Sequence, residues 1–172
     1  MRTERLDLEP LRVEHALGLY EGMRDPEVHR YVPHLPPASL SELQETLRRR
    51  IERKGAPGDR WFNWTPVLRA TGEPIGNVQL TTLAGGQALL GYFLLRAAWG
   101  RGYAREACSA VIGYARDEAG VRSLIAEIDA RNAASLRLVE ALGFSFVSVQ
   151  RIEDPAGESD EARYELPLNP AS

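Results

Sequence analysis

The feature that most constrains the fold is an apolar strand that leads into a two-glycine loop and then directly into a helix. The strand pattern covers Ala88 to Leu95, Gly100 and Gly102 mark the loop, and helix-forming residues follow from about Tyr103 to Glu118. Backbone N–H groups at such a helix N-terminus converge on a bound anion, and the helix dipole adds to the attraction. Small residues let a phosphate approach this closely. The segment therefore predicts a phosphate-bearing ligand that is held mainly by backbone.

Length and composition narrow the class of protein. The chain has 172 residues, a net charge of −3 and one cysteine, Cys108. This length predicts a single domain, residues 1–172, with a core that needs neither disulfides nor metal. One cysteine and three scattered histidines show no metal-site pattern, and the negative charge argues against a nucleic-acid partner that relies on overall charge. The charged first residues and the lack of a long apolar run predict a cytoplasmic protein with no membrane segment.

The order of the expected elements predicts an α+β fold around one mixed, mostly antiparallel sheet. Strand patterns joined by turns come first, as an antiparallel meander, and a β-α-β-α-β order follows. We expect strands at 4–10, 61–68, 74–83, 88–95, 122–129, 144–150 and 163–168, and helices at 13–23, 39–54, 103–118 and 132–142. The segment from Asp154 to Glu161 is expected to be a polar loop.

Two common phosphate loops can be excluded at Gly100 to Arg105. A Walker-type loop ends in Gly-Lys-Ser/Thr, which this segment lacks. A dinucleotide fingerprint requires a third glycine where this chain has Arg105, and it requires an early βαβ unit; neither is present. What remains is a small residue at alternate positions, Gly100, Gly102 and Ala104, at the start of a helix.

This remaining pattern resembles a known family. The run Trp99-Gly100-Arg101-Gly102-Tyr103-Ala104 is similar to the acetyl-CoA loop of the GCN5-related N-acetyltransferases (GNAT), specifically their RimJ/RimL-like ribosomal-protein branch. The second signature of that branch resembles Asn132-Ala133-Ala134-Ser135-Leu136 with Leu142-Gly143-Phe144. Similar segments elsewhere are Thr3-Glu4-Arg5-Leu6, Asp25-Pro26-Glu27-Val28 and Gly72-Glu73-Pro74-Ile75-Gly76. The resemblance covers nearly the whole chain and implies the GNAT fold: six to seven strands with a central splayed parallel pair, flanked by about four helices.

The resemblance implies acetyl-CoA as the cofactor, CoA as a product and no metal. It places the pyrophosphate on backbone N–H groups from Arg101 to Arg105, with added charge from one of these arginines. The pantetheine arm would run between the strands at 88–95 and 122–129, where a free N–H at Leu94 or Leu95 would polarise the acetyl carbonyl. The implied cofactor contacts are Leu94, Leu95, Arg96, Arg101, Gly102, Tyr103, Ala104, Arg105, Asn132 and Ser135.

Acetyl transfer to an amine requires that the amine lose a proton, and it is helped by a donor to the departing thiolate. Ser135, one turn after the helix-capping Asn132, is predicted to hydrogen-bond the sulfur, or is simply a polar residue of the first turn. Many relatives carry a tyrosine where this chain has Val139, so that acid is missing from that place. Glu127 is the first candidate for the base and Glu106 the second. A water chain is an alternative, because an α-amine titrates at about pH 8.

The acceptor has no motif of its own. By resemblance a protein N-terminus is the first acceptor class and a small amine (a polyamine, an aminoglycoside or an amino-acid-like antibiotic) is the second. A non-catalytic acyl-CoA sensor is the rival of a different class. Tyr31 and His34 are candidate acceptor contacts, and the segments 23–37 and 154–161 are expected to shape the acceptor pocket. Dimers are frequent among similar proteins, so a homodimer is a further expectation.

Overall fold

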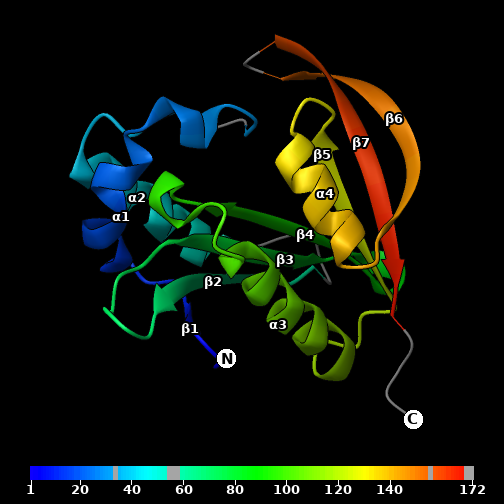
Figure 1. The fold of residues 1–172 in the computed structure, drawn as a ribbon, viewed down its shortest axis with the longest axis horizontal. Coiled ribbons are helices and arrows are strands. Elements are labelled where there is room, and N and C mark those ends of the chain that lie inside the picture. Colours follow the sequence, from blue (N-terminus) through cyan, green and yellow to red (C-terminus); the bar gives the residue numbers. More distant parts are fainter. Residues whose placement is uncertain (33–34, 54–58, 155–156, 169–172) are drawn as a thin grey trace.

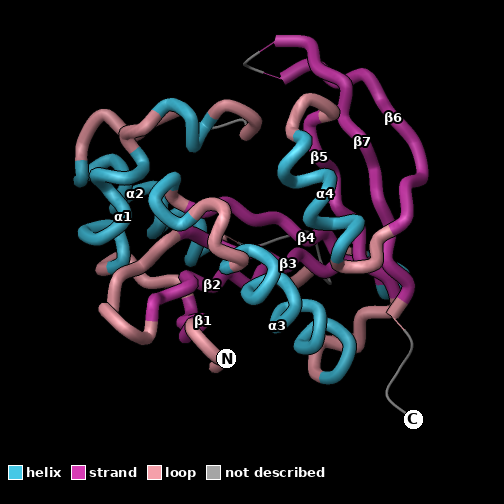
Figure 2. The backbone as a smooth tube through the Cα atoms, viewed as in Figure 1, coloured by secondary structure: helices cyan, strands magenta, loops and turns pink. Residues whose placement is uncertain are grey.

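A computed structural model describes residues 1–32, 35–53, 59–154 and 157–168. In this part of the chain, seven strands form one sheet in the order β1-β2-β3-β4-β5-β7-β6 (Figures 1 and 2). The strands are β1 (Leu6–Pro10), β2 (Trp61–Leu68), β3 (Gly76–Thr82), β4 (Gln87–Leu94), β5 (Ser123–Asp129), β6 (Ser145–Asp154) and β7 (Gly157–Pro167). The helices are α1 (His15–Met23), α2 (Leu40–Glu52), α3 (Tyr103–Asp117) and α4 (Ala133–Ala141), with short 3-10 turns η1 (Pro26–His29), η2 (Ala84–Gly86) and η3 (Arg96–Ala98). The α+β fold with a mixed sheet is confirmed.

The helices cover both faces of the sheet. Val111 of α3 and Val139 of α4 pack in one apolar cluster with Leu94 of β4. Leu19 of α1 packs in a second cluster, with Phe93 of the same strand at its edge. Successive side chains of a strand point to opposite faces, so α3 and α4 lie on one face and α1 and α2 on the other. No helix in the described ranges has the length and apolar content that crossing a membrane requires.

The sheet opens between its two central parallel strands. β4 and β5 pair only where Gln87 to Leu89 meet Ser123 to Ile125. β4 then continues to Leu94 and β5 to Asp129, and within the described residues no further pairing joins them. Figure 1 shows β5, β6 and β7 turned steeply away from β1 to β4. The expected splay between parallel strands is therefore present, and we call this opening the splay.

One expected element is wrong. Asp154 to Glu161, expected as a loop, is largely strand: β6 ends at Asp154, β7 begins at 157, and their ladder pairs Glu153 with Glu158 and Arg151 with Asp160. This hairpin end is mostly exposed, so its sequence lacks the alternation of apolar residues that reveals a half-buried strand. Polar pairs between the strands take the place of apolar contacts, for example Arg151 Nη2 and Glu158 Oε2 at 2.6 Å.

Candidate active site

The edge of β4 that faces the splay carries backbone groups directed into it. The Leu95 N–H donates to the Ile75 carbonyl, across the ladder with β3, at 2.8 Å. Residues of an antiparallel ladder alternate in direction, so the amides of Tyr92 and Leu94 point the other way, toward β5. The expectation of a free N–H at Leu95 is therefore wrong, because that group is used within the sheet. The N–H groups that face the splay belong to Tyr92 and Leu94.

Trp99 ties the loop to the end of this strand. Its indole Nε1–H donates to the Leu94 carbonyl at 2.7 Å, while 46% of the residue stays exposed. The carbonyl of Leu94 is thus occupied by the protein itself. At this end of β4 the Leu94 N–H is the group left to face a ligand.

The two-glycine loop and the first turn of α3 line a cavity of about 480 Å³, the loop cavity. Gly100 and Gly102 have φ angles of 71° and 78°, a left-handed conformation that glycine adopts without strain. Gly102 is the N-cap of α3 and offers no side chain to the first N–H groups of the helix, which therefore suit an anion. The predicted cofactor residues that line this cavity are Leu94, Gly102, Tyr103, Ala104, Arg105, Asn132 and Ser135.

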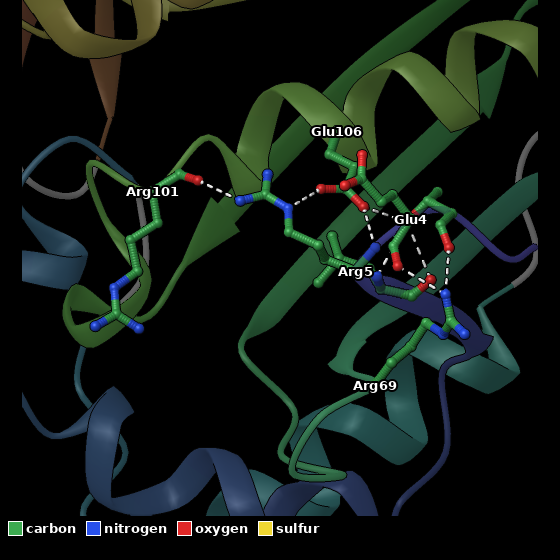
Figure 3. A network of polar contacts seen from close by, with 7 residues as sticks. Glu4, Arg5, Arg69, Arg101 and Glu106 are labelled. Atoms are coloured by element: carbon green, nitrogen blue, oxygen red, sulfur yellow. Dashed lines mark hydrogen bonds and ion pairs between the residues drawn. The ribbon is translucent and has the colours of Figure 1, made fainter.

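Three predicted cofactor residues lie elsewhere. Leu95 packs in the apolar cluster of α1 and α2, and Arg96 Nη1 pairs with Asp25 at 3.4 Å. The Arg101 carbonyl accepts a hydrogen bond from Arg5, and Figure 3 shows the Arg101 side chain directed away from that contact. None of the three is among the described residues that line the loop cavity. The lining there combines the small residues of the loop with larger side chains such as Tyr31, Phe93 and Trp99.

A second cavity of about 380 Å³, the splay cavity, lies along β5. Glu127 and Asp129 of β5 line it, together with Glu158 and Glu161 of β7. The two cavities share the lining residues Arg30, Tyr31, Val32, Tyr92, Asn132 and Ser135. A ligand that fills one cavity can therefore meet a ligand in the other at this common wall. The acceptor candidate Tyr31 belongs to it, whereas His34 is outside the described residues.

The common wall is built around the start of α4. The Asn132 side chain caps the helix by accepting from the Ser135 N–H at 3.1 Å, as the capping interpretation requires. The Tyr92 hydroxyl donates to the Ser135 carbonyl at 3.4 Å, which brings a phenol to the first turn of α4 from the neighbouring strand. Burial of this side chain raises the pKa of Tyr92, so its hydroxyl keeps its proton.

Two carboxylates of the splay cavity, Glu127 and Asp129, are paired with arginines. Glu127 Oε1 accepts from Arg163 Nη1 at 3.3 Å, and Asp129 binds the Arg131 guanidinium at 2.6 Å. Hydrogen bonds from Arg131 lower the pKa of Asp129. Across the described residues, no group of three or more potential metal ligands is arranged to hold an ion.

Glu106, the second candidate base, is committed to another task. Its carboxylate accepts from the Thr3 hydroxyl at 2.6 Å and from the Arg5 amide at 2.7 Å. Burial by itself would raise the pKa of Glu106, but the hydrogen bonds from Thr3 and Arg5 outweigh it and lower that pKa. Glu106 lines neither cavity among the described residues, so it is an anchor of the fold rather than a base.

Comparisons with known proteins identify the family of the chain. The acetyltransferase (GNAT) domain family matches residues 5–145. The chain is 28% identical to the N-acetyltransferase p20 of Bacillus licheniformis, over 83% of this chain and 80% of that protein. The chain therefore belongs to the GNAT acetyltransferase family, as its motifs indicated, and it is an acyltransferase.

Solved structures share the fold over almost the whole chain. One is RimL, a ribosomal α-N-protein acetyltransferase in complex with CoA, with a TM-score of 0.83, 14% identity and 96% of each chain covered. Another is the spermidine N-acetyltransferase of Vibrio cholerae in complex with CoA and spermine, with a TM-score of 0.79, 16% identity, and 96% of this chain and 97% of that one covered. The two act on different classes of amine, so the shared fold leaves the acceptor open.

Sequence reasoning missed two residues that the structure brings to the site, Tyr92 and Arg5. For Tyr92 a signal existed: it shares its face of β4 with the core residues Leu90 and Leu94, so it points toward α4. For Arg5 the only signal was the family-like Thr3-Glu4-Arg5-Leu6 segment, which does not reveal a contact with the loop.

Proposed function

We propose that this chain transfers an acetyl group from acetyl-CoA directly to a primary amine, with a protein N-terminal α-amine as the first acceptor class. The observation that carries the proposal is the common wall of the two cavities, at Tyr92, Asn132 and Ser135. A cofactor bound at the glycine loop and an amine in the splay cavity would meet there. Held side by side, the two reactants need no covalent enzyme intermediate, since positioning supplies much of the rate.

The residues of the loop cavity suit a diphosphate. The free N–H groups at the start of α3, the left-handed glycines and the Arg105 side chain together form an anion site. Acetyl-CoA supplies an activated thioester when it is bound. In the overall reaction the amine nitrogen bonds to the acetyl carbon and loses a proton, the carbon–sulfur bond breaks, and the thiolate gains a proton.

The chain's own groups divide this work. We assign the polarisation of the acetyl carbonyl to the N–H groups of Tyr92 and Leu94, because these face the splay. We assign the donor to the departing sulfur to the Tyr92 hydroxyl, with the Ser135 hydroxyl as its neighbour. A phenol with a raised pKa keeps its proton at neutral pH, so the Tyr92 hydroxyl can turn from the Ser135 carbonyl, 3.4 Å away, and donate a hydrogen bond to the thiolate. Glu127 remains the candidate base on the opposite side of the wall.

The hydrogen bond that Glu127 accepts from Arg163 favours an acceptor amine that loses its proton easily. Its carboxylate already accepts from Arg163, so it is poorly placed to take a proton from a strongly basic amine. An α-amine has a pKa of about 8, compared with about 10.4 for a lysine side chain, and so requires less help. This supports a protein N-terminus over a lysine or an alkyl amine.

A second acceptor class, a polyamine, is favoured by a different observation. Four carboxylates line the splay cavity: Glu127, Asp129, Glu158 and Glu161. A chain of ammonium groups is complementary to these carboxylates, although Arg30 and Arg131 also line the cavity and offset part of their charge.

The test is to measure CoA release with acetyl-CoA and two acceptor panels, peptides with free N-termini and linear polyamines. We expect turnover with peptides and none with the same peptides after N-terminal blocking. Turnover with polyamines alone would replace the first acceptor class by the second. Tight acetyl-CoA binding without turnover on any amine would contradict the enzymatic proposal and favour a sensor.

A further inference from the structure

A single arginine of the N-terminal segment reaches the glycine loop (Figure 3). Arg5 Nη1 donates to the Arg101 carbonyl at 2.9 Å, and Arg5 Nε donates to Glu106 Oε2 at 2.7 Å. The same guanidinium lies over the ring of Tyr103, 4.6 Å from its centre. One side chain thus contacts the loop and the first turn of α3 together.

Glu106 holds this arginine in place from both ends. Its Oε2 accepts from the Arg5 side chain, and its Oε1 accepts from the Arg5 backbone N–H and from the Thr3 hydroxyl. Its side chain is only 15% exposed. The Glu106 carboxylate thus accepts three hydrogen bonds, although the Arg5 side chain is 43% exposed, and a charge-assisted pair with added hydrogen bonds fixes geometry better than a simple exposed ion pair does. Arg5 therefore has little freedom to move away from the loop.

The bond from Arg5 to Arg101 orients the next amide. The Arg101 carbonyl and the Gly102 N–H belong to one planar trans peptide unit, in which C=O and N–H point in opposite directions. Arg5 holds the carbonyl from outside the loop cavity, because Arg5 is not among the described lining residues. The Gly102 N–H is consequently directed to the other side of the loop, and Gly102 does line the cavity.

Gly102 is also closely covered by the same arginine. A Cβ built on Gly102 would lie 3.4 Å from Arg5 Nη2, with the backbone at a φ of 78°. The arginine thus packs against the position that a side chain would occupy.

We infer that Arg5 is a positioning residue for the cofactor loop: it holds the Arg101–Gly102 peptide so that the Gly102 N–H is presented to the diphosphate of acetyl-CoA. Thr3 and Glu106 act through Arg5. The inference rests on the proposed use of acetyl-CoA. It assigns to the N-terminal segment a part in cofactor affinity, distant from the reacting atoms.

The test compares Arg5→Ala with Arg69→Ala. Arg69 binds the same segment, through the carbonyls of Thr3 (3.1 Å) and Glu4 (2.7 Å), and no contact of Arg69 with the loop is recorded among the described residues. We expect Arg5→Ala to weaken CoA binding, measured by calorimetry, by about tenfold or more. Without Arg5 the Gly102 N–H is no longer held toward the diphosphate, so a hydrogen bond to a charged group is lost. Arg69→Ala should leave CoA affinity within about twofold of the wild type.

A second readout separates positioning from a general loss of structure. S-acetylpantetheine carries the thioester but no phosphate, so its rate of acetyl transfer should be the same in Arg5→Ala and in the wild type. Equal CoA affinity in Arg5→Ala and wild type, or an equal loss in Arg69→Ala, would overturn the inference. Wild-type protein that binds no CoA would instead contradict the proposed function. If Arg5→Ala does not fold, Thr3→Val serves as the second variant, because it removes one Glu106 contact. Weaker CoA affinity in that variant, with an unchanged rate toward S-acetylpantetheine, supports the same conclusion. Unchanged CoA affinity opposes it.

Discussion

The two cavities of this protein are built on opposite principles. The anion-binding end of the loop cavity is shaped by backbone: two left-handed glycines and the uncapped N–H groups of α3, with the Arg5–Glu106 ion pair beside them. The splay cavity is shaped by charged side chains from β5 and β7, most of them in exposed or half-exposed pairs such as Glu127 with Arg163. Exposed ion pairs contribute little to stability, so their residues can change without harm to the fold. The loop cavity therefore suits the diphosphate of a cofactor, which does not vary, and the splay cavity suits an acceptor that can vary.

The contrast predicts the largest effect at Gly102. Gly102→Val forces a branched side chain into a left-handed conformation, which costs on the order of 1–2 kcal/mol for any L-residue, and into contact with Arg5. We expect CoA binding to weaken by about a hundredfold as the oriented N–H groups are lost. Calorimetric titration with CoA measures the change.

The matched control is Gly113→Val, in the same helix, where a Cβ meets nothing within 4 Å. This variant should bind CoA as the wild type does. Equal affinities in the two variants would show that the glycine loop is only a turn.

At the common wall, Tyr92→Phe should lower kcat while CoA affinity stays the same. Loss of a hydrogen-bond donor to the departing thiolate should lower the rate about tenfold. The control is Tyr114→Phe, a tyrosine of the same apolar cluster whose ring packs against Phe62. An unchanged kcat in Tyr92→Phe together with a reduced kcat in Ser135→Ala would transfer the role to the serine.

The smallest effect is expected in the splay cavity. Glu127→Gln should reduce kcat/KM a few-fold below pH 8 and less above it, because an α-amine with a pKa of about 8 is already neutral at high pH. Glu165→Gln is the control: Glu165 shares Arg163 with Glu127, at 2.8 Å, but is not among the described residues that line the cavity. A kcat/KM that falls by the same factor at every pH would oppose the role of Glu127 as a base.

Features that depend on residue type were predictable from the sequence. Gly100 and Gly102 indicated a loop that an anion can approach closely, because they carry no side chain, and Asn132 indicated a helix cap, because its side-chain oxygen can accept from the first N–H groups of a helix. The splay followed from the family resemblance rather than from any local pattern. Of the common wall, the sequence singled out Tyr31, Asn132 and Ser135, but not Arg30, Val32 or Tyr92.

Features that depend on long-range contact were not predictable. Nothing local distinguishes Leu95 from Leu94, since the ladder with β3 decides which N–H is used. The β6–β7 hairpin has no alternation of apolar residues at its exposed end, so the sequence pattern predicts a loop where Glu158 and Glu161 lie in a strand. Arg5 carries no sign of its partner, Glu106, because the two lie on separate elements.

The contacts of Thr3 and Arg5 with Glu106 and Arg101 also affect how the chain folds. Thr3 and Glu106 are 103 positions apart, and Arg5 and Arg101 are 96 apart. Closing so large a loop costs chain entropy that local structure does not repay, and contacts of such long range form slowly. The contacts of α3 within its own turns are local, but the contacts of Arg5 with Glu106 and Arg101 require the first strand to have joined the sheet. Tight binding of the cofactor would thus distinguish the fully folded chain from a partly folded one.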